Sequence, residues 1–122
     1  MRALRHSIIA LTPFETPDVR LCLHAVRAEV LGVLDLGRDV SVGLAALRAL
    51  SAEIGRGYGV RLAEPRAFEP NAIAAHRPDC VVLPDPAHVA QWRAALPKDV
   101  AVIAQIVSME EAALAVTRAL TR

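Results

Sequence analysis

Leu31-Gly32-Val33-Leu34-Asp35 is a short apolar run that ends at an acidic residue. It is one of five short apolar runs along the chain. Continuous apolar runs of this kind are typical of strands buried on both faces, as in parallel sheets. A segment with helical character follows each run, and helices are the usual crossovers between parallel strands. The sequence therefore predicts an α/β fold of five βα units with a mainly parallel sheet, its strands at 7–11, 31–35, 58–62, 80–84 and 100–104.

Capping residues and prolines indicate where the helices begin. Thr16-Pro17-Asp18 predicts an N-cap, a proline at the first helical position and an acid in the first turn. Asp85 is expected to cap a helix that starts at Pro86, and Ser108 and Glu111 form a capping box. We expect helices at about 17–26, 40–54, 71–76, 86–96 and 110–120.

Two architectures are built from units of this kind, and both remain open. An open, flavodoxin-like doubly wound sheet is complete at 122 residues, and length alone favours it. Five units are otherwise the first part of a TIM barrel, which needs about 250 residues. In either case we treat residues 1–122 as a single α/β domain, complete or a fragment of a larger multienzyme. Ligands bind at the carboxyl ends of the strands in both architectures.

Composition excludes several classes of protein. There are 14 basic and 13 acidic residues, and this net charge of +1 gives no electrostatic case for binding nucleic acid or an anionic membrane. No apolar stretch approaches the roughly 20 residues of a membrane helix, so a cytoplasmic location is expected. Cys22 and Cys80 are expected to pack as reduced, small hydrophobic residues.

Familiar catalytic motifs do not occur. The sequence contains no phosphate-binding G-x-G-x-x-G or G-x-x-x-x-G-K-[ST] string and no G-x-S-x-G nucleophile elbow. The glycine-rich stretch 55–59 leads into a predicted strand, whereas a phosphate loop follows one. We therefore predict no catalytic residue and no metal ligand, because the four histidines lack metal-ligand spacing: His6, His24, His76 and His88.

A candidate ligand-binding face is formed by the residues just beyond each predicted strand. Polar groups there can bind a phosphate or another polar ligand, although turns and helix caps are polar in every α/β protein. This face comprises Thr12, Pro13, Phe14, Glu15, Asp35, Arg38, Asp39, Arg61, Glu64, Asp85, His88, Gln105 and Ser108.

Four strings in this order, at 8–13, 28–35, 58–62 and 102–112, resemble the first part of the nitronate monooxygenase (2-nitropropane dioxygenase-like) family of flavin-dependent TIM barrels. That family includes flavin-dependent enoyl reductases of fatty acid and polyketide synthases. The resemblance covers most of this chain but only five of the eight barrel units. The first two units are also similar to N-terminal domains of large bacterial modular polyketide synthases.

The resemblance implies FMN at the carboxyl ends of the strands. Where the family has small, glycine-rich residues beside the flavin, this chain has Phe14 and Glu15. The loops that would hold the FMN phosphate and the family's catalytic base belong to units beyond the fifth. FMN is therefore expected to bind weakly or not at all to this chain alone. The residues that the resemblance assigns to cofactor binding are Thr12, Pro13, Phe14, Arg61 and Gln105.

Three functions follow from these observations. The leading expectation is a non-catalytic or incomplete flavin-barrel-like domain that serves as a structural or interaction part of a polyketide or fatty acid synthase. Its partners would be a second copy or other synthase domains, because an unclosed sheet leaves its edge strands uncovered. The second is a fragment of an FMN-dependent oxidoreductase of the nitronate monooxygenase or enoyl reductase kind, which needs the rest of its barrel. The third is a small-ligand binding module.

Overall fold

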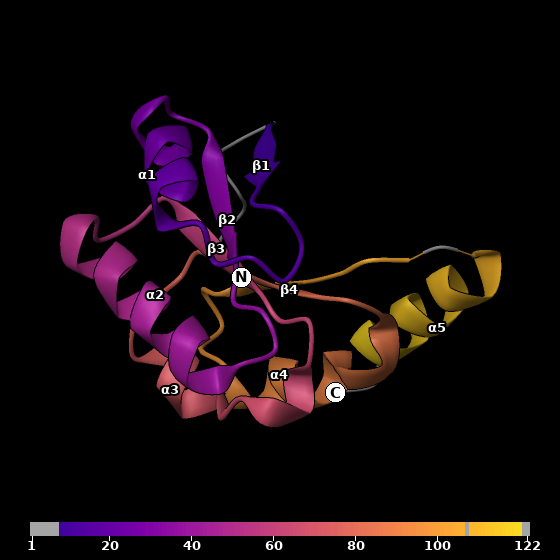
Figure 1. Ribbon diagram of the computed structural model, residues 1–122. Helices are drawn as coiled ribbons and strands as arrows, with labels where there is room; N and C mark the ends of the chain where they lie inside the picture. Colours follow the sequence, from indigo (N-terminus) through magenta and orange to yellow (C-terminus); the bar gives the residue numbers. More distant parts are fainter. Residues whose placement is uncertain (1–7, 107, 121–122) are drawn as a thin grey trace.

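The computed structural model describes residues 8–106 and 108–120 as five parallel strands that alternate with helices (Figure 1). The α/β fold class and the five βα units are thereby confirmed, and Ser7, predicted to open the first strand, lies outside the described residues. The strands are β1 (Ile9–Leu11), β2 (Leu31–Asp35), β3 (Tyr58–Arg61), β4 (Cys80–Leu83) and β5 (Ala101–Ala104). The helices are α1 (Val19–Arg27), α2 (Val40–Glu53), α3 (Pro70–Ala74), α4 (Val89–Ala95) and α5 (Met109–Leu120), with 3-10 turns η1 (Pro65–Ala67) and η2 (Pro86–His88).

The strands pair in their chain order, β1-β2-β3-β4-β5, and each neighbouring pair is parallel. Each crossover therefore moves one strand further in the same direction, as in a TIM barrel. A doubly wound sheet instead reverses its direction of growth at a switch point. Of the two architectures, the strand order matches five successive barrel units rather than the doubly wound sheet that length alone favoured. Within the described residues, β1 and β5 are the two edges of the sheet.

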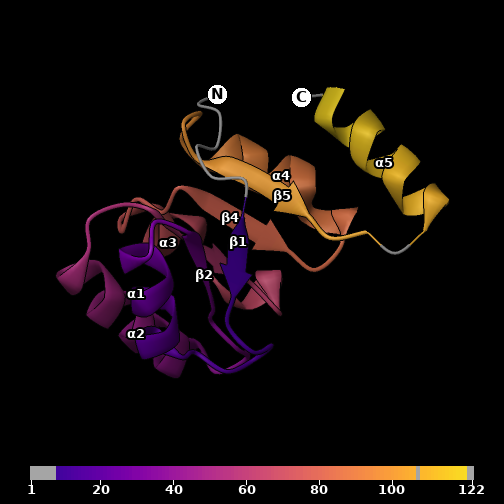
Figure 2. The same ribbon diagram turned by 90° about the horizontal axis from the view of Figure 1, so that it is seen from above.

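The main hydrophobic core lies on the convex side of the sheet, between the strands and helices α1 to α4 (Figure 2). Alternate strand residues such as Leu34, Val60 and Val81 point into it and are fully buried. Trp92 of α4 is 1% exposed in this core, where it packs its helix against the sheet. Cys22 of α1 is also buried and reduced, as predicted.

A second, smaller core fills the concave side of the sheet. It joins Leu31 and Val33 of β2 to Cys80 and Val82 of β4, although β3 lies between these two strands. The residue of β3 at that level is Gly59, and a Cβ there would overlap the Sγ of Cys80. The missing side chain lets the side chains of β2 and β4 meet across β3. The concave side is therefore packed by the domain's own side chains.

Helix starts agree with the predicted caps except at α1. Asp18, not Thr16, is its N-cap, since the Asp18 side chain accepts a hydrogen bond from the backbone N–H of Leu21 at 3.0 Å. The Thr16 N–H instead donates to the Pro13 carbonyl, so Thr16 closes the preceding turn. The caps predicted at Asp85 and Ser108 are confirmed, because each side chain accepts a backbone N–H at the start of η2 or α5.

Helix α5 differs from the other helices in its packing. It lies against α4 and η2 and extends away from the sheet beyond β5 (Figure 1). Three of its large apolar side chains, those of Met109, Leu114 and Val116, are exposed. Among the described residues, none of the helices has the length and apolar character needed to cross a membrane.

Candidate functional site

The carboxyl ends of three strands bring an acid, an arginine and an amide together on the concave side. Asp35 ends β2 and is the register partner of Arg61, which ends β3. Gln105 follows β5, two residues after Ile103, whose side chain packs on the concave side. Because side chains alternate between the two faces of a strand, these three residues share the face of Val33, Gly59 and Ile103.

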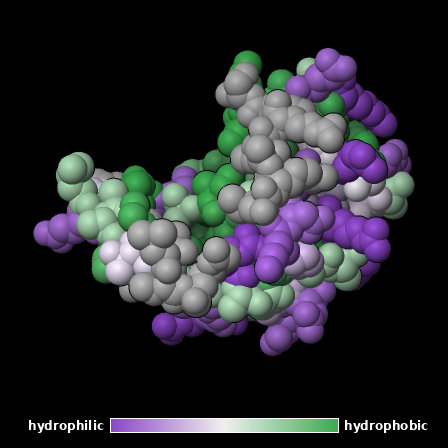
Figure 3. All heavy atoms as spheres, turned by 180° about the vertical axis from the view of Figure 1, so that it is seen from behind, coloured by the Kyte–Doolittle hydropathy of each residue, from purple (hydrophilic) through white to green (hydrophobic). Residues whose placement is uncertain are grey.

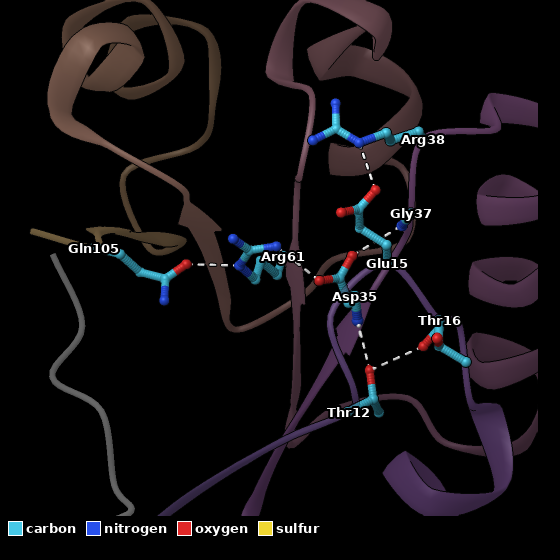
Figure 4. Close-up of polar contacts among 8 residues, drawn as sticks. All are labelled: Thr12, Glu15, Thr16, Asp35, Gly37, Arg38, Arg61 and Gln105. Carbon is cyan, nitrogen blue, oxygen red and sulfur yellow. Dashed lines mark hydrogen bonds and ion pairs between the residues drawn. The ribbon is translucent and has the colours of Figure 1, made fainter.

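Arg61 is the centre of this group (Figure 4). Its Nη1 donates to Asp35 Oδ2 at 2.8 Å, and its Nε donates to Gln105 Oε1 at 2.6 Å. The guanidinium carbon also lies 4.1 Å from the centroid of the Phe14 ring, within the range of a cation–π contact. We call Thr12, Phe14, Asp35, Arg61 and Gln105 the Arg61 cluster.

Asp35 ties this cluster to the backbone. Its side chain is fully buried, and its Oδ1 accepts the N–H of Gly37 at 2.9 Å. The Asp35 N–H donates to Thr12 Oγ1 at 2.9 Å, and that hydroxyl donates to the Thr16 carbonyl at 3.3 Å (Figure 4). The Arg61 side chain is only 9% exposed, so the two charges form a buried ion pair. Such pairs are costly to break on one side, because an uncompensated charge is left behind.

The structure brings together four of the five residues that the family resemblance assigns to FMN: Thr12, Phe14, Arg61 and Gln105. Pro13 is exposed, and its carbonyl accepts the Thr16 N–H in the turn after β1. Asp35 belonged to the wider candidate face but not to the cofactor set. This ion pair could have been predicted from the sequence, because an acidic residue ends one strand and an arginine ends the next.

The rest of the candidate face does not join this cluster. Arg38 forms exposed ion pairs with Glu15 and Glu64, and Glu15 adopts a left-handed backbone conformation with φ 63°. Asp39 caps α2, where hydrogen bonds from the Val42 backbone N–H and then the Ser41 hydroxyl lower its pKa. The residues that instead lie at helix starts are Asp85, His88 and Ser108.

The arrangement of the Arg61 cluster does not fit a bound flavin. Two of the three guanidinium nitrogens of Arg61 already donate to protein oxygens, and one of these is the side-chain oxygen of Gln105. The Thr12 hydroxyl is hydrogen-bonded on both sides. Phe14 lies over Arg61 where close approach of a planar ring system needs small residues. A flavin could take the place of these partners only after their present bonds were broken.

Other parts of the described chain offer little alternative chemistry. Burial raises the pKa of both Cys22 and Cys80 to about 12, so neither thiol is an activated nucleophile. No group of three or more potential ligands for a metal ion occurs among residues 8–106 and 108–120. His76 is partly buried, with its Nδ1 2.9 Å from Ser51 Oγ.

A cavity of about 330 Å³ lies at the amino ends of the strands, whereas the Arg61 cluster lies at their carboxyl ends. It is formed by the loops that precede β3, β4 and β5, and Arg56, Arg77 and Asp99 line it. None of the predicted site residues lines this cavity. Ligands of barrel enzymes bind at the carboxyl ends of the strands, so the Arg61 cluster remains the candidate site.

Comparison of the chain with protein-family models, with curated proteins and with solved structures finds no match.

Proposed function

We propose that this domain is a non-catalytic, flavin-barrel-like structural or interaction part of a polyketide or fatty acid synthase. The observation that carries the proposal is the closure of the Arg61 cluster, in which the groups that would face a cofactor bind one another. The synthase context rests on the resemblance of the four strings to that family.

The energy of the buried ion pair supports a structural role for Arg61. Breaking such a pair on one side costs about 3–5 kcal/mol. A ligand that pulled Arg61 away from Asp35 would have to repay this cost, which corresponds to a loss of roughly a hundredfold or more in affinity. The pair also connects β2 to β3, and Gln105 extends the connection to the segment after β5. Arg61 is therefore better suited to link the strands across the concave side through its ion pair and hydrogen bond than to bind a ligand.

The edges of the sheet support an interaction role. β1 and β5 each have one strand neighbour among the described residues, and unpaired strand edges favour association with another chain. Ile8 and Ile9 at the β1 edge are 64% and 46% exposed. A domain whose contribution is binding rather than chemistry accounts for these exposed apolar residues.

An FMN titration of the purified chain tests the proposal, with flavin fluorescence and protein absorbance near 450 nm as readouts. We expect no saturable binding up to about 1 mM FMN. Saturable binding at micromolar FMN that Arg61→Ala weakens, and that the matched surface change Arg38→Ala leaves intact, would favour the FMN-dependent oxidoreductase fragment instead. Arg38 suits this control because its own ion pairs are exposed.

A further inference from the structure

Helix α5 carries large apolar side chains on two of its sides. Met109 and Val116, 87% and 61% exposed, are seven residues apart and so lie on one side of the helix. Leu114, 47% exposed, is two residues from Val116 and therefore about 160° around the helix from it. A helix with a single interface is polar on its opposite side. The packing of α5 against α4 and η2 thus buries only part of its apolar surface.

Exposed apolar residues also occur at the Arg61 cluster, on the concave side of the sheet. Phe14 lies on one side of Arg61 and Gln105 on another, and Ile106 follows Gln105 directly. Seen from behind, hydrophobic residues line a hollow between the part that carries α5 and the rest of the domain (Figure 3). We call the exposed apolar residues of these elements the β1–α5 surface: Ile8, Ile9, Phe14, Ile106, Met109, Leu114 and Val116.

The size of the β1–α5 surface suits a stable protein interface. Its seven side chains are about half exposed or more. At roughly 100 Å² of accessible area apiece they offer about 700 Å², close to the ~800 Å² that each partner buries in a standard interface.

We propose that the β1–α5 surface binds a second copy of this chain about a two-fold axis, with α5 of each copy in the hollow of the other. This inference rests on the proposed interaction role. A projecting helix and a hollow side by side on one chain are self-complementary, and a two-fold axis brings each to the other. Because the net charge of each copy is only +1, the electrostatic repulsion between two copies is weak, and near-neutral chains tend to associate.

Sedimentation velocity of the chain from about 2 to 200 µM tests this pairing. We expect a species of twice 13.1 kDa, and both Met109→Glu and Val116→Glu should weaken the dimer at least tenfold. Met109 is so exposed that its replacement leaves the fold intact, which circular dichroism verifies. The matched control is Val42→Glu, because Val42 is 52% exposed on α2, outside the β1–α5 surface. This control should leave the dimer unchanged.

A monomer at 200 µM, or equal loss of the dimer in Val42→Glu, would overturn the pairing of two copies. A monomer that also fails to bind FMN would leave the proposed interaction role in place, with another synthase domain as the occupant of the surface. A dimer that binds FMN at micromolar concentration would instead overturn the proposed function and retain the pairing.

Discussion

Arg61→Ala is expected to be among the most damaging single substitutions in this domain. It removes the guanidinium that faces Asp35 at 2.8 Å and leaves that carboxylate fully buried. The N–H of Gly37 remains as a partner of Asp35, but it carries no full charge. Breaking a buried pair on one side costs about 3–5 kcal/mol, out of a total of about 5–15 kcal/mol for a typical domain. For a domain of this size, that loss lowers the melting temperature by about 10–20 °C.

Urea unfolding followed by circular dichroism measures this loss, with Arg38→Ala as the control. Arg38 also forms two ion pairs, but its side chain is 59% exposed, so its removal should cost at most about 1 kcal/mol. The double change Asp35→Asn with Arg61→Met should be less damaging than Arg61→Ala, because no charge is left buried. A free energy of unfolding for Arg61→Ala within about 1 kcal/mol of the wild type would refute the reasoning.

Two further predictions concern the cores. Gly59→Ala should lower the free energy of unfolding by about 1–3 kcal/mol, because its Cβ would overlap the Sγ of Cys80. Gly55→Ala should not lower it, because a Cβ at Gly55 meets no atom within 4 Å. Equal urea midpoints for the two variants would contradict the role of Gly59 in the second core. Burial raises the pKa of Cys22 and Cys80 from 9.0, and that of Tyr58 from 10.0, to about 12. The unfolded chain loses these protons at a lower pH than the folded chain does, so the free energy of unfolding should fall as the pH rises above about 9. A urea midpoint that stays constant from about pH 8 to 10.5 would argue against this burial.

Most of the fold could be predicted from the sequence because its strands are short apolar runs with sharp ends. The predicted strand 31–35 matches β2, and β3, β4 and β5 are each one residue shorter than predicted. β1 begins at Ile9, and Ser7 of the predicted strand lies outside the described residues. The cap of α1 was assigned wrongly to Thr16, since threonine and aspartate both cap helices and only the three-dimensional turn chooses between them.

Strand order could not be predicted, because it depends on which strands pair in space. Chain length favoured the doubly wound sheet, yet β1 pairs with β2 and each later strand adds at the same edge. The candidate site was predicted in its location and only partly in its chemistry. Thr12, Arg61 and Gln105 lie together as expected, but the register that sets Arg61 beside Asp35 emerges only when the sheet is assembled.

The central claim is that the side chains of the Arg61 cluster bind one another and stabilise the fold, and do not form a cofactor site. The Nε–H resonance of Arg61 in a ¹⁵N spectrum reports on this directly, and the spectrum of Arg61→Ala assigns it. The hydrogen bond from this group to Gln105 at 2.6 Å predicts slow exchange with solvent and no change in position up to about 1 mM FMN. Rapid exchange, or a shift that saturates with FMN, would contradict the account.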